Sequence, residues 1–236
     1  MLKKQCSQCG LDQNYKSKIT YNNALKTNSL CKKCSNLNKN LRQGDCSILL
    51  QDTLLTYYWI GFILADAHIH KNKRLKVALA SKDIEHLLKL KAYLKIKTHR
   101  NYHNYSEFSI MDSISIEKLC IKFDIKQNKT EKACNISGIK NNLLKSLFIG
   151  FIDGDGSISK QYKRNDACLK IKCHSAWLDN LNIFSQIFLG KTQAYLNKEG
   201  YANLNIGNHL ILQNLKQFSI NNKLPILERK WKNIEL

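Results

Sequence analysis

Two apolar segments of the sequence match one another, and each ends in an aspartate. The first reads YYWIGFILADAHIH and contains Asp66, and the second reads LFIGFIDGDGSIS and contains Asp155. When the two are aligned on these acids, 89 residues apart, Gly61 falls on Gly150. A repeat of this length predicts a duplicated domain, because the repeats of solenoid proteins are shorter.

The segments that follow each motif also agree in type. RLKVALAS and ACLKIKCHS alternate apolar and basic side chains, which predicts half-buried strands. Amphipathic helices are expected next, over 82–95 and 177–189, and one side of the first is predicted to hold Ile84, Leu87, Leu88 and Leu94. Two strand-like stretches and a further helix, near Ile114–Phe123 and His209–Ile220, complete the halves. The sequence therefore predicts an α+β fold with the pattern αββαββα, twice.

The glycine in each motif suggests how the halves pack. Glycine inside a helix costs about 1 kcal/mol relative to alanine, so its expected use is the close approach of two backbones. Helices crossing at Gly61 and Gly150 would bring Asp66 and Asp155 together at their C-terminal ends, where the helix dipole also disfavours negative charge. Divalent metal is the expected compensation. The alternative is that GDGS is an ordinary turn, because Asp-Gly is a favoured turn pair.

Four of the nine cysteines are arranged in two CxxC pairs. Cys6 and Cys9 precede Gly10, which suits a sharp turn, and Cys31 and Cys34 form the second pair. Two such pairs can place four thiolates tetrahedrally around Zn²⁺, which predicts a structural zinc module over 1–45. Disulfides and unpaired structural thiols are the alternatives, although reducing conditions inside cells disfavour disulfides.

The other cysteines have no comparable spacing. Cys168, Cys173 and the neighbouring His174 are expected to be core or strand residues. The predicted zinc module carries nine Lys and Arg against two Asp, a net charge of +7, which favours an auxiliary DNA clamp.

Charge also dominates the whole chain, with a formal net charge of +20. AT-rich coding can explain the number of lysines, but the resulting field still attracts polyanions, and nucleic acid is the expected partner. The apolar fraction of 43% allows a folded core. With no signal peptide, apolar span or amphipathic basic helix in the sequence, we expect a soluble intracellular protein with no membrane partner and no secretion.

From about Leu54 onward, the sequence resembles the LAGLIDADG homing endonucleases of the single-chain, two-motif type. IGFIDGDGSI is close to the family pattern, and IGFILADAHI is a looser form. CSQCG and CKKC resemble the short zinc modules found on many phage-like endonucleases. The resemblance implies two pseudo-symmetric repeats, over 53–135 and 142–236, whose four-stranded antiparallel sheets lie as a saddle in the major groove of double-stranded DNA.

The resemblance also implies a catalytic metal site. The last acid of each motif, Asp66 and Asp155, would bind Mg²⁺, and Ala65 and Gly154 would offer backbone carbonyl oxygens. The first motif departs from the family pattern, with leucine at its earlier acid position. Asp153 of the second motif is therefore expected to be a structural residue or to support the metal ligands without binding the metal itself.

Basic residues complete the implied site. QNKT and LERKW resemble family elements that point to Lys129 and Lys230 as catalytic lysines, with solvated lysine as the alternative. The expected DNA-reading residues lie on the outward face of the strands and are Arg74, Lys76, Lys170, Lys172, Gln193, Asn203 and Asn205.

The resulting prediction is a monomeric, site-specific endonuclease of the kind used in intron homing. Staggered cuts across the minor groove would leave 3′ overhangs. The alternative is an RNA-splicing maturase or a DNA-binding regulator on the same scaffold without cleavage.

Overall fold

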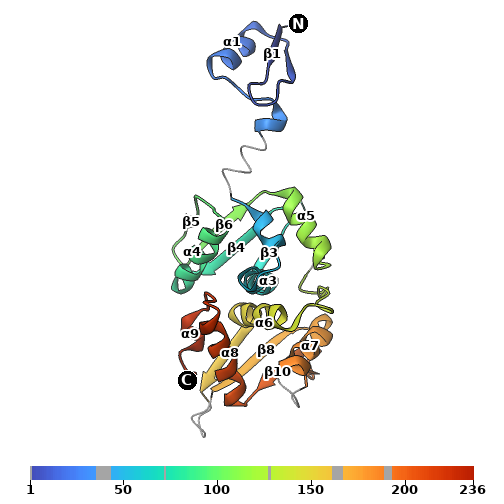
Figure 1. Cartoon of the computed structure of the whole chain (residues 1–236), viewed down its shortest axis with the longest axis vertical. Helices are drawn as coiled ribbons and strands as arrows, with labels where there is room; N and C mark the ends of the chain where they lie inside the picture. The colour runs from blue at the N-terminus through green and yellow to red at the C-terminus, as the bar shows by residue number, and fades with distance from the viewer. Residues whose placement is uncertain (1, 36–43, 72, 127–128, 161–166, 189–192) are drawn as a thin grey trace.

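The computed structural model describes most of the chain (Figure 1). The described residues are 2–35, 44–71, 73–126, 129–160, 167–188 and 193–236. Among them, no helix is both long and apolar enough to cross a membrane.

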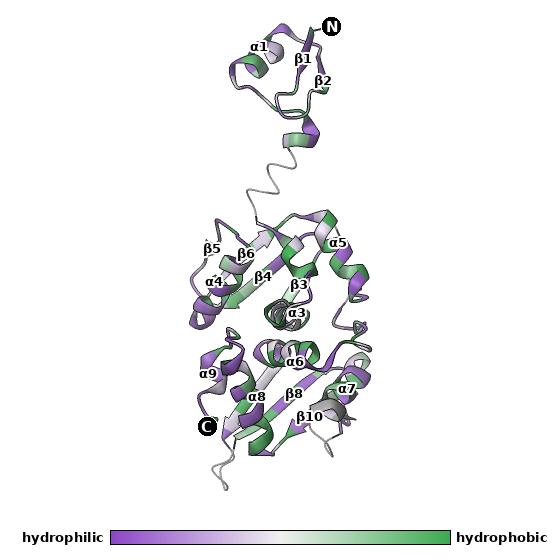
Figure 2. Cartoon of the chain, viewed as in Figure 1, coloured by the Kyte–Doolittle hydropathy of each residue, from purple (hydrophilic) through white to green (hydrophobic). Residues whose placement is uncertain are grey.

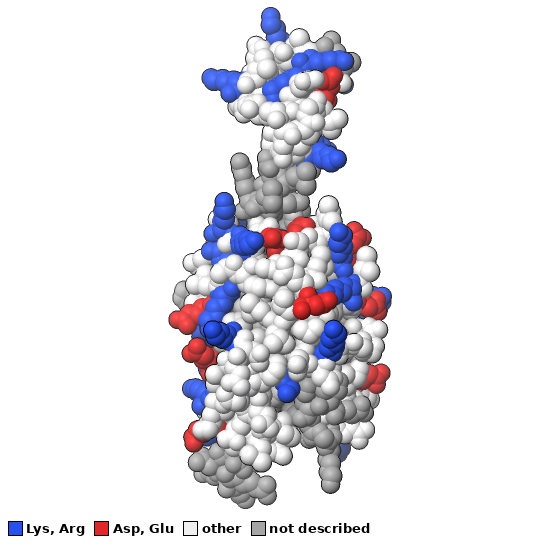
Figure 3. Space-filling view, viewed as in Figure 1, with Lys and Arg blue, Asp and Glu red and all other residues white. Residues whose placement is uncertain are grey.

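The N-terminal module consists of a short hairpin and a helix. β1 (Leu2–Gln5) pairs antiparallel with β2 (Asp12–Tyr15), and α1 (Lys18–Lys26) follows. The Ser17 side chain accepts a hydrogen bond from the backbone N–H of Ile19, which fixes the start of α1. Most of the charged side chains visible on this module are Lys and Arg, whereas the two signs of charge are interspersed over the rest of the molecule (Figure 3).

The first repeat follows a 3-10 helix, η1 (Cys46–Leu50). Its elements are, in chain order, α3 (Leu54–Asp66), β3 (Ala67–Ile69), β4 (Leu75–Ala80), the 3-10 helix η2 (Ser81–Asp83), α4 (Ile84–Tyr93), β5 (Arg100–Asn101), β6 (Tyr105–Ile110) and α5 (Ser113–Lys122). This order confirms the predicted αββαββα pattern.

The second repeat has the same order with one helix added. Its elements are α6 (Asn141–Asp155), β7 (Gly156–Lys160), β8 (Ala167–His174), the 3-10 helix η3 (Ser175–Trp177), α7 (Leu178–Phe188), β9 (Tyr195–Leu196), β10 (Tyr201–Ile206), α8 (His209–Asn221) and α9 (Glu228–Trp231). The single turn α9 carries Lys230.

Each repeat builds one four-stranded antiparallel sheet. The strand orders are β3-β4-β6-β5 and β7-β8-β10-β9, so the two sheets have the same topology. Buried residues alternate with partly or fully exposed ones along β4 and along residues 169–172 of β8, as the period of two predicts. Hydrophobic and hydrophilic residues both occur on these strands (Figure 2). The predicted apolar side of α4 is wrong at one position, because Leu88 is 38% exposed and Leu90 is fully buried instead.

Helices α3 and α6 lie next to one another between the two sheets (Figure 1). Their contact requires glycine on both sides. A Cβ atom built on Gly61 would lie 1.9 Å from the backbone oxygen of Leu147, and one built on Gly150 would lie 1.9 Å from that of Tyr58. Tyr58 and Leu147 occupy equivalent positions in the two motifs, so the contact is pseudo-symmetric. This close packing holds the C-terminal ends of the helices side by side.

Candidate active site

The two motif aspartates lie at the ends of the paired helices. Asp66 is the last residue of α3 and Asp155 the last of α6, and both are exposed to solvent. Ala65 and Gly154 precede them, and a Cβ atom on Gly154 would lie 2.2 Å from the Cβ of Ala65. The second motif therefore needs its glycine for the same close approach that brings the acids together.

Each of the two predicted lysines caps one of these helix ends. Lys129 Nζ donates hydrogen bonds to the carbonyl oxygens of Leu64 at 2.5 Å and Ala65 at 3.0 Å. Lys230 Nζ does the same on α6, with bonds of 2.6 Å to the Asp153 oxygen and 2.8 Å to the Gly154 oxygen. An ammonium group suits a helix C-terminus, where the last carbonyl groups have no partners within the helix.

The acids and lysines influence one another electrostatically. Although Asp66 keeps contact with solvent, the groups packed around its carboxylate partly desolvate it. This desolvation, followed by the negative charge of Asp155, raises the pKa of Asp66. Burial also raises the pKa of Asp155, while Lys129 and Lys230 oppose the increase. The pKa values of both lysines are lowered, chiefly by burial. The site thus concentrates two carboxylates that repel each other, with compensating positive charge beside them.

The residues present fit a divalent cation. Carboxylate and carbonyl oxygens are the ligands that Mg²⁺ prefers, and the mutual repulsion of Asp66 and Asp155 is what a cation would relieve. Each carbonyl oxygen has two lone pairs, so the hydrogen bonds from the lysines leave Ala65 and Gly154 able to contribute one more contact. A metal ligand role for these four residues stays a prediction.

Asp153 has a different environment from the motif aspartates. It is buried at 1% exposure, and its carboxylate accepts hydrogen bonds from Tyr58 Oη at 2.5 Å, Trp231 Nε1 at 2.6 Å and the Leu227 backbone N–H at 2.9 Å. Burial raises its pKa to about 6, although these hydrogen bonds act in the opposite direction. Asp153 therefore ties the C-terminal segment to both motif helices.

A cavity of about 580 Å³ connects Asp155 to the second sheet. Lys129 and Asp155 line one part of it, and Lys172 and Tyr201 line another. Lys172 is held there by a 2.6 Å hydrogen bond to Glu199, and its ammonium lies 4.4 Å from the centre of the Tyr201 ring. Asp155 and the strands β8 and β10, which were predicted to read DNA, thus line the same cavity.

The predicted DNA-reading residues of the second sheet share one face. Lys172 lies opposite Asn203 and Lys170 lies opposite Asn205 in the pairing of β8 with β10. Paired residues point to the same side of a sheet, so these four form a patch. Asn205 also donates a 2.8 Å hydrogen bond to Tyr195 Oη.

The remaining predicted readers are placed less uniformly. Lys76 lies on β4, and its Nζ is 2.6 Å from the carboxylate of Glu107 on β6. Arg74 precedes β4 and contacts His70 Nε2 at 3.1 Å, and Gln193 lies exposed before β9. Sequence reasoning considered only basic and amide side chains, and it missed the acid that holds Lys76.

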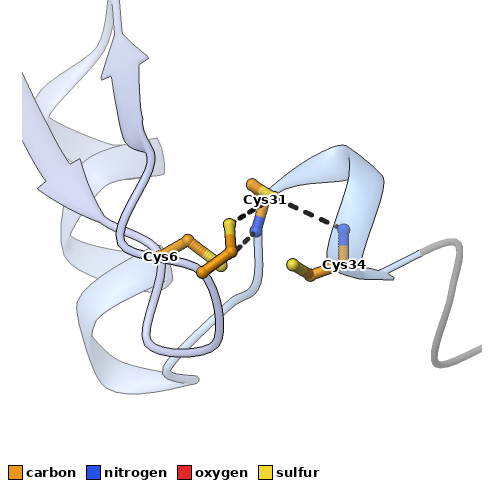
Figure 4. Close-up of side chains that lie close together, drawn as sticks. Cys6, Cys31 and Cys34 are labelled. Carbon is orange, nitrogen blue, oxygen red and sulfur yellow. Dashed lines mark hydrogen bonds between the residues drawn. The ribbon is translucent and has the colours of Figure 1, made fainter.

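The four predicted zinc ligands converge in the N-terminal module. The sulfur atoms of Cys6, Cys9, Cys31 and Cys34 all lie within 4.8 Å of one another, and three of these residues are drawn in Figure 4. The turn after Cys6 is closed by a 2.8 Å hydrogen bond from the Gly10 N–H to the Cys6 oxygen, with Gly10 at a φ of +71°. Only glycine adopts this conformation without strain.

The local hydrogen bonds favour a thiolate at this cluster. Backbone N–H groups, first that of Cys31, lower the pKa of Cys6 to about 6. The pKa of Cys34 is raised to about 12, chiefly through its interaction with the Cys9 side chain. Adjacent thiolates cannot all be charged unless a cation lies between them, so this cluster could bind zinc.

Comparison with known proteins gives a fold but no sequence relative. No family profile and no curated protein matches the sequence. Among solved structures, I-SmaMI bound to an uncleaved DNA target with calcium ions matches at a TM-score of 0.52 and 14% identity, covering 73% of this chain and 86% of that one. The LAGLIDADG homing endonuclease I-GzeII in complex with its DNA target matches at 0.51 and 14%, covering 75% and 86%. The chain has the LAGLIDADG endonuclease fold.

A third structure agrees with these two. The LAGLIDADG meganuclease I-AabMI, bound to uncleaved DNA, has a TM-score of 0.51 and 14% identity, with 75% of this chain and 86% of that chain covered. The resemblance expected from two short motifs thus extends to the arrangement of both repeats. Of the predicted family elements, Gln127 and Asn128 of QNKT lie outside the described residues.

Proposed function

We propose that this chain is a site-specific endonuclease that cuts both strands of a long DNA target and leaves 3′ overhangs. The observation that carries this proposal is the pair of acids at the ends of α3 and α6, with one lysine bound to each helix end. A protein that only binds DNA has no use for two neighbouring carboxylates on the surface that approaches the phosphates.

The proposed roles follow from the positions of the residues. Asp66 and Asp155, with the carbonyl oxygens of Ala65 and Gly154, would hold Mg²⁺. The cation would supply positive charge that stabilises the departing 3′ oxygen and makes the attacking water more acidic. Lys129 and Lys230 would hold protons beside the scissile phosphates, where their charge also favours the phosphorane-like transition state.

Cleavage of a randomised DNA library tests this function. We expect Mg²⁺-dependent double-strand cuts at one sequence. When the two ends produced by each cut are ligated and sequenced, both should carry a 3′ overhang. Binding of one sequence in the library without any cut would instead support the DNA-binding regulator, and preferential binding of structured RNA would support the maturase.

We further propose that the four cysteines bind one structural Zn²⁺. Metal analysis of protein purified without chelator is expected to find one zinc per chain. Cys31→Ser should release it and unfold the first 45 or so residues, because so small a module cannot fold without its metal. The duplicated domain should keep its thermal transition, since it has its own core. Cys120→Ser, which changes a half-buried thiol outside the cluster, is the matched control and should retain zinc.

The net charge of +20 leads to a prediction about salt. If the protein contacts about 10 phosphates, the logarithm of the DNA association constant should fall with the logarithm of salt concentration at a slope near −9. Fluorescence anisotropy with a labelled duplex over a range of salt concentrations measures this slope. A slope shallower than about −3 would mean that most of the lysines reflect coding bias and do not contact DNA.

A further inference from the structure

The two 3-10 turns η2 and η3 occupy equivalent places in the repeats. Ser81 and Ser175 begin them, 94 residues apart, so Asp83 is the counterpart of Trp177. These two side chains differ in every chemical respect, yet each is buried and each binds the segment that carries the other repeat's lysine. The comparison of the two motifs does not predict that each turn binds the lysine segment of the other repeat.

The turn of the first repeat holds Lys230 of the second. Asp83 is 8% exposed and accepts two hydrogen bonds from Arg229, from Nε to Oδ1 and from Nη2 to Oδ2, the latter 2.6 Å long. Burial alone would raise the pKa of Asp83, but the bonds from Arg229 outweigh it and the pKa is lowered. On the other side of Lys230, Trp231 donates to Asp153. The turn α9 is therefore fixed on both flanks of the lysine.

The turn of the second repeat holds Lys129 of the first. The Trp177 indole N–H donates a 3.0 Å hydrogen bond to the backbone oxygen of Lys129 itself. Trp177 is 3% exposed, and its ring lies 5.0 Å from that of Phe151 on α6, so its position is determined by the core of the second repeat. Asn180 adds a 2.8 Å hydrogen bond to the oxygen of Cys134 farther along the same segment.

We propose that Asp83 and Trp177 are positioning residues that place Lys230 and Lys129, respectively, so that each repeat orients the lysine of the other. This proposal rests on the proposed endonuclease function. The lysine segments follow α5 and α8. Among the described residues, they are hydrogen-bonded to the end of their own motif helix through the ammonium group and, in the second repeat, through Asp153. Without the contact from Asp83 or Trp177, the lysine would lose one of the contacts that fix its backbone, while the acids and the sheets stayed in place.

Strand-resolved cleavage tests the proposal. Asp83→Asn removes the ion pair with Arg229, and Trp177→Phe removes the indole donor while keeping an aromatic ring. Because a misplaced group costs about 10- to 100-fold in rate, each variant should slow one strand by that factor and the other by less than about twofold. The slowed strands should be opposite in the two variants, and Asp83→Asn should slow the same strand as Lys230→Arg. Nicked plasmid should accumulate in both cases.

Glu228→Gln provides the matched control. It breaks the exposed ion pair of Glu228 with Lys89 at 3.9 Å, on the same turn as Arg229, and should slow neither strand. A merely structural role for Asp83 or Trp177 would reduce the amount of folded protein and slow both strands equally, which would overturn the proposal. Wild-type cleavage rates on both strands in both variants would overturn the proposal as well.

A second measurement does not depend on cleavage. In protein labelled with ¹³C at lysine Cε and free of divalent metal, the signals of Lys129 and Lys230 can be assigned by their loss in the two Lys→Arg variants. Asp83→Asn should shift the Lys230 signal toward those of exposed lysines and leave Lys129 unchanged, and Trp177→Phe should do the reverse. If wild-type protein cuts no DNA, the proposed function fails while this experiment still decides the positioning. Unchanged lysine signals in both variants would refute it.

Discussion

Asp155→Asn is expected to abolish double-strand cleavage while DNA binding persists. The change keeps the size of the side chain but removes the negative charge of the proposed metal ligand at the end of α6. Losing several kcal/mol of transition-state stabilisation corresponds to a rate lower by about 1,000-fold or more. In EDTA the variant should bind its target at least as tightly as wild type, because a carboxylate facing phosphates from a helix C-terminus is repulsive. Asp66→Asn should behave in the same way.

One cleavage series and one gel-shift series compare these variants. The matched control is Asp179→Asn, the same chemical change at an exposed acid in the first turn of α7, and it should cleave at the wild-type rate. Full cleavage by Asp155→Asn would end the metal-site proposal. Weaker binding by Asp155→Asn in EDTA would show that the carboxylate does not face the DNA backbone.

Asp153 is unsuitable as a neutral control, although its counterpart in the first motif is Leu64. Its carboxylate accepts three hydrogen bonds, from Tyr58, Leu227 and Trp231. Asparagine has only one acceptor oxygen, so its amide N–H₂ group would face at least one of these donors. Loss of such buried bonds destabilises by about 1–3 kcal/mol each, and the prediction from sequence that this acid is structural has a concrete basis here.

Much of the fold could be predicted because the repeat was visible in short-range patterns. Alternation in RLKVALAS and ACLKIKCHS depends on neighbouring residues alone, and it gave β4 and β8 with the correct buried faces. The glycine in each motif gave the contact between α3 and α6. Leu88 was placed wrongly because the sequence allows either Leu88 or Leu90 on the apolar face of α4. Only the packing of the helix against its sheet decides which of the two is buried.

The candidate site could be predicted only as far as the motifs extend. Asp66, Asp155 and the two lysines stand in recognisable local sequences. Asp83 and Trp177 do not, because their partners lie 146 residues and 48 residues away in the chain, and a single sequence holds no record of such pairs. Asp83 and Trp177 occupy equivalent positions but bind by different chemistry, one as an acceptor and the other as a donor. An alignment of the two repeats therefore does not reveal that they share a proposed positioning role.

The close contact of α3 with α6 carries the last prediction, which concerns stability. At an exposed helix position, Gly→Ala raises the free energy of unfolding by about 1 kcal/mol. Gly150→Ala should instead lower it by about 3 kcal/mol, at the upper end of what overpacking costs, because the new Cβ would lie 1.9 Å from a backbone oxygen that cannot rotate away. Urea denaturation of the metal-free protein, followed by tryptophan fluorescence, measures the change.

Gly200→Ala is the control for the substitution itself. A Cβ atom on Gly200 would meet no atom within 4 Å. The only cost expected is the strain of an alanine at a φ of +79°, which should lower the free energy of unfolding by about 1 kcal/mol. Gly61→Ala should cost as much as Gly150→Ala, since its Cβ would meet the equivalent oxygen of Leu147 at the same distance. The double variant should cost less than the sum of the two, because helices already forced apart by one methyl group accommodate the second more easily. An increase in stability from Gly150→Ala would show that the helices are not in backbone contact, and the acids would then lack the frame that brings them together.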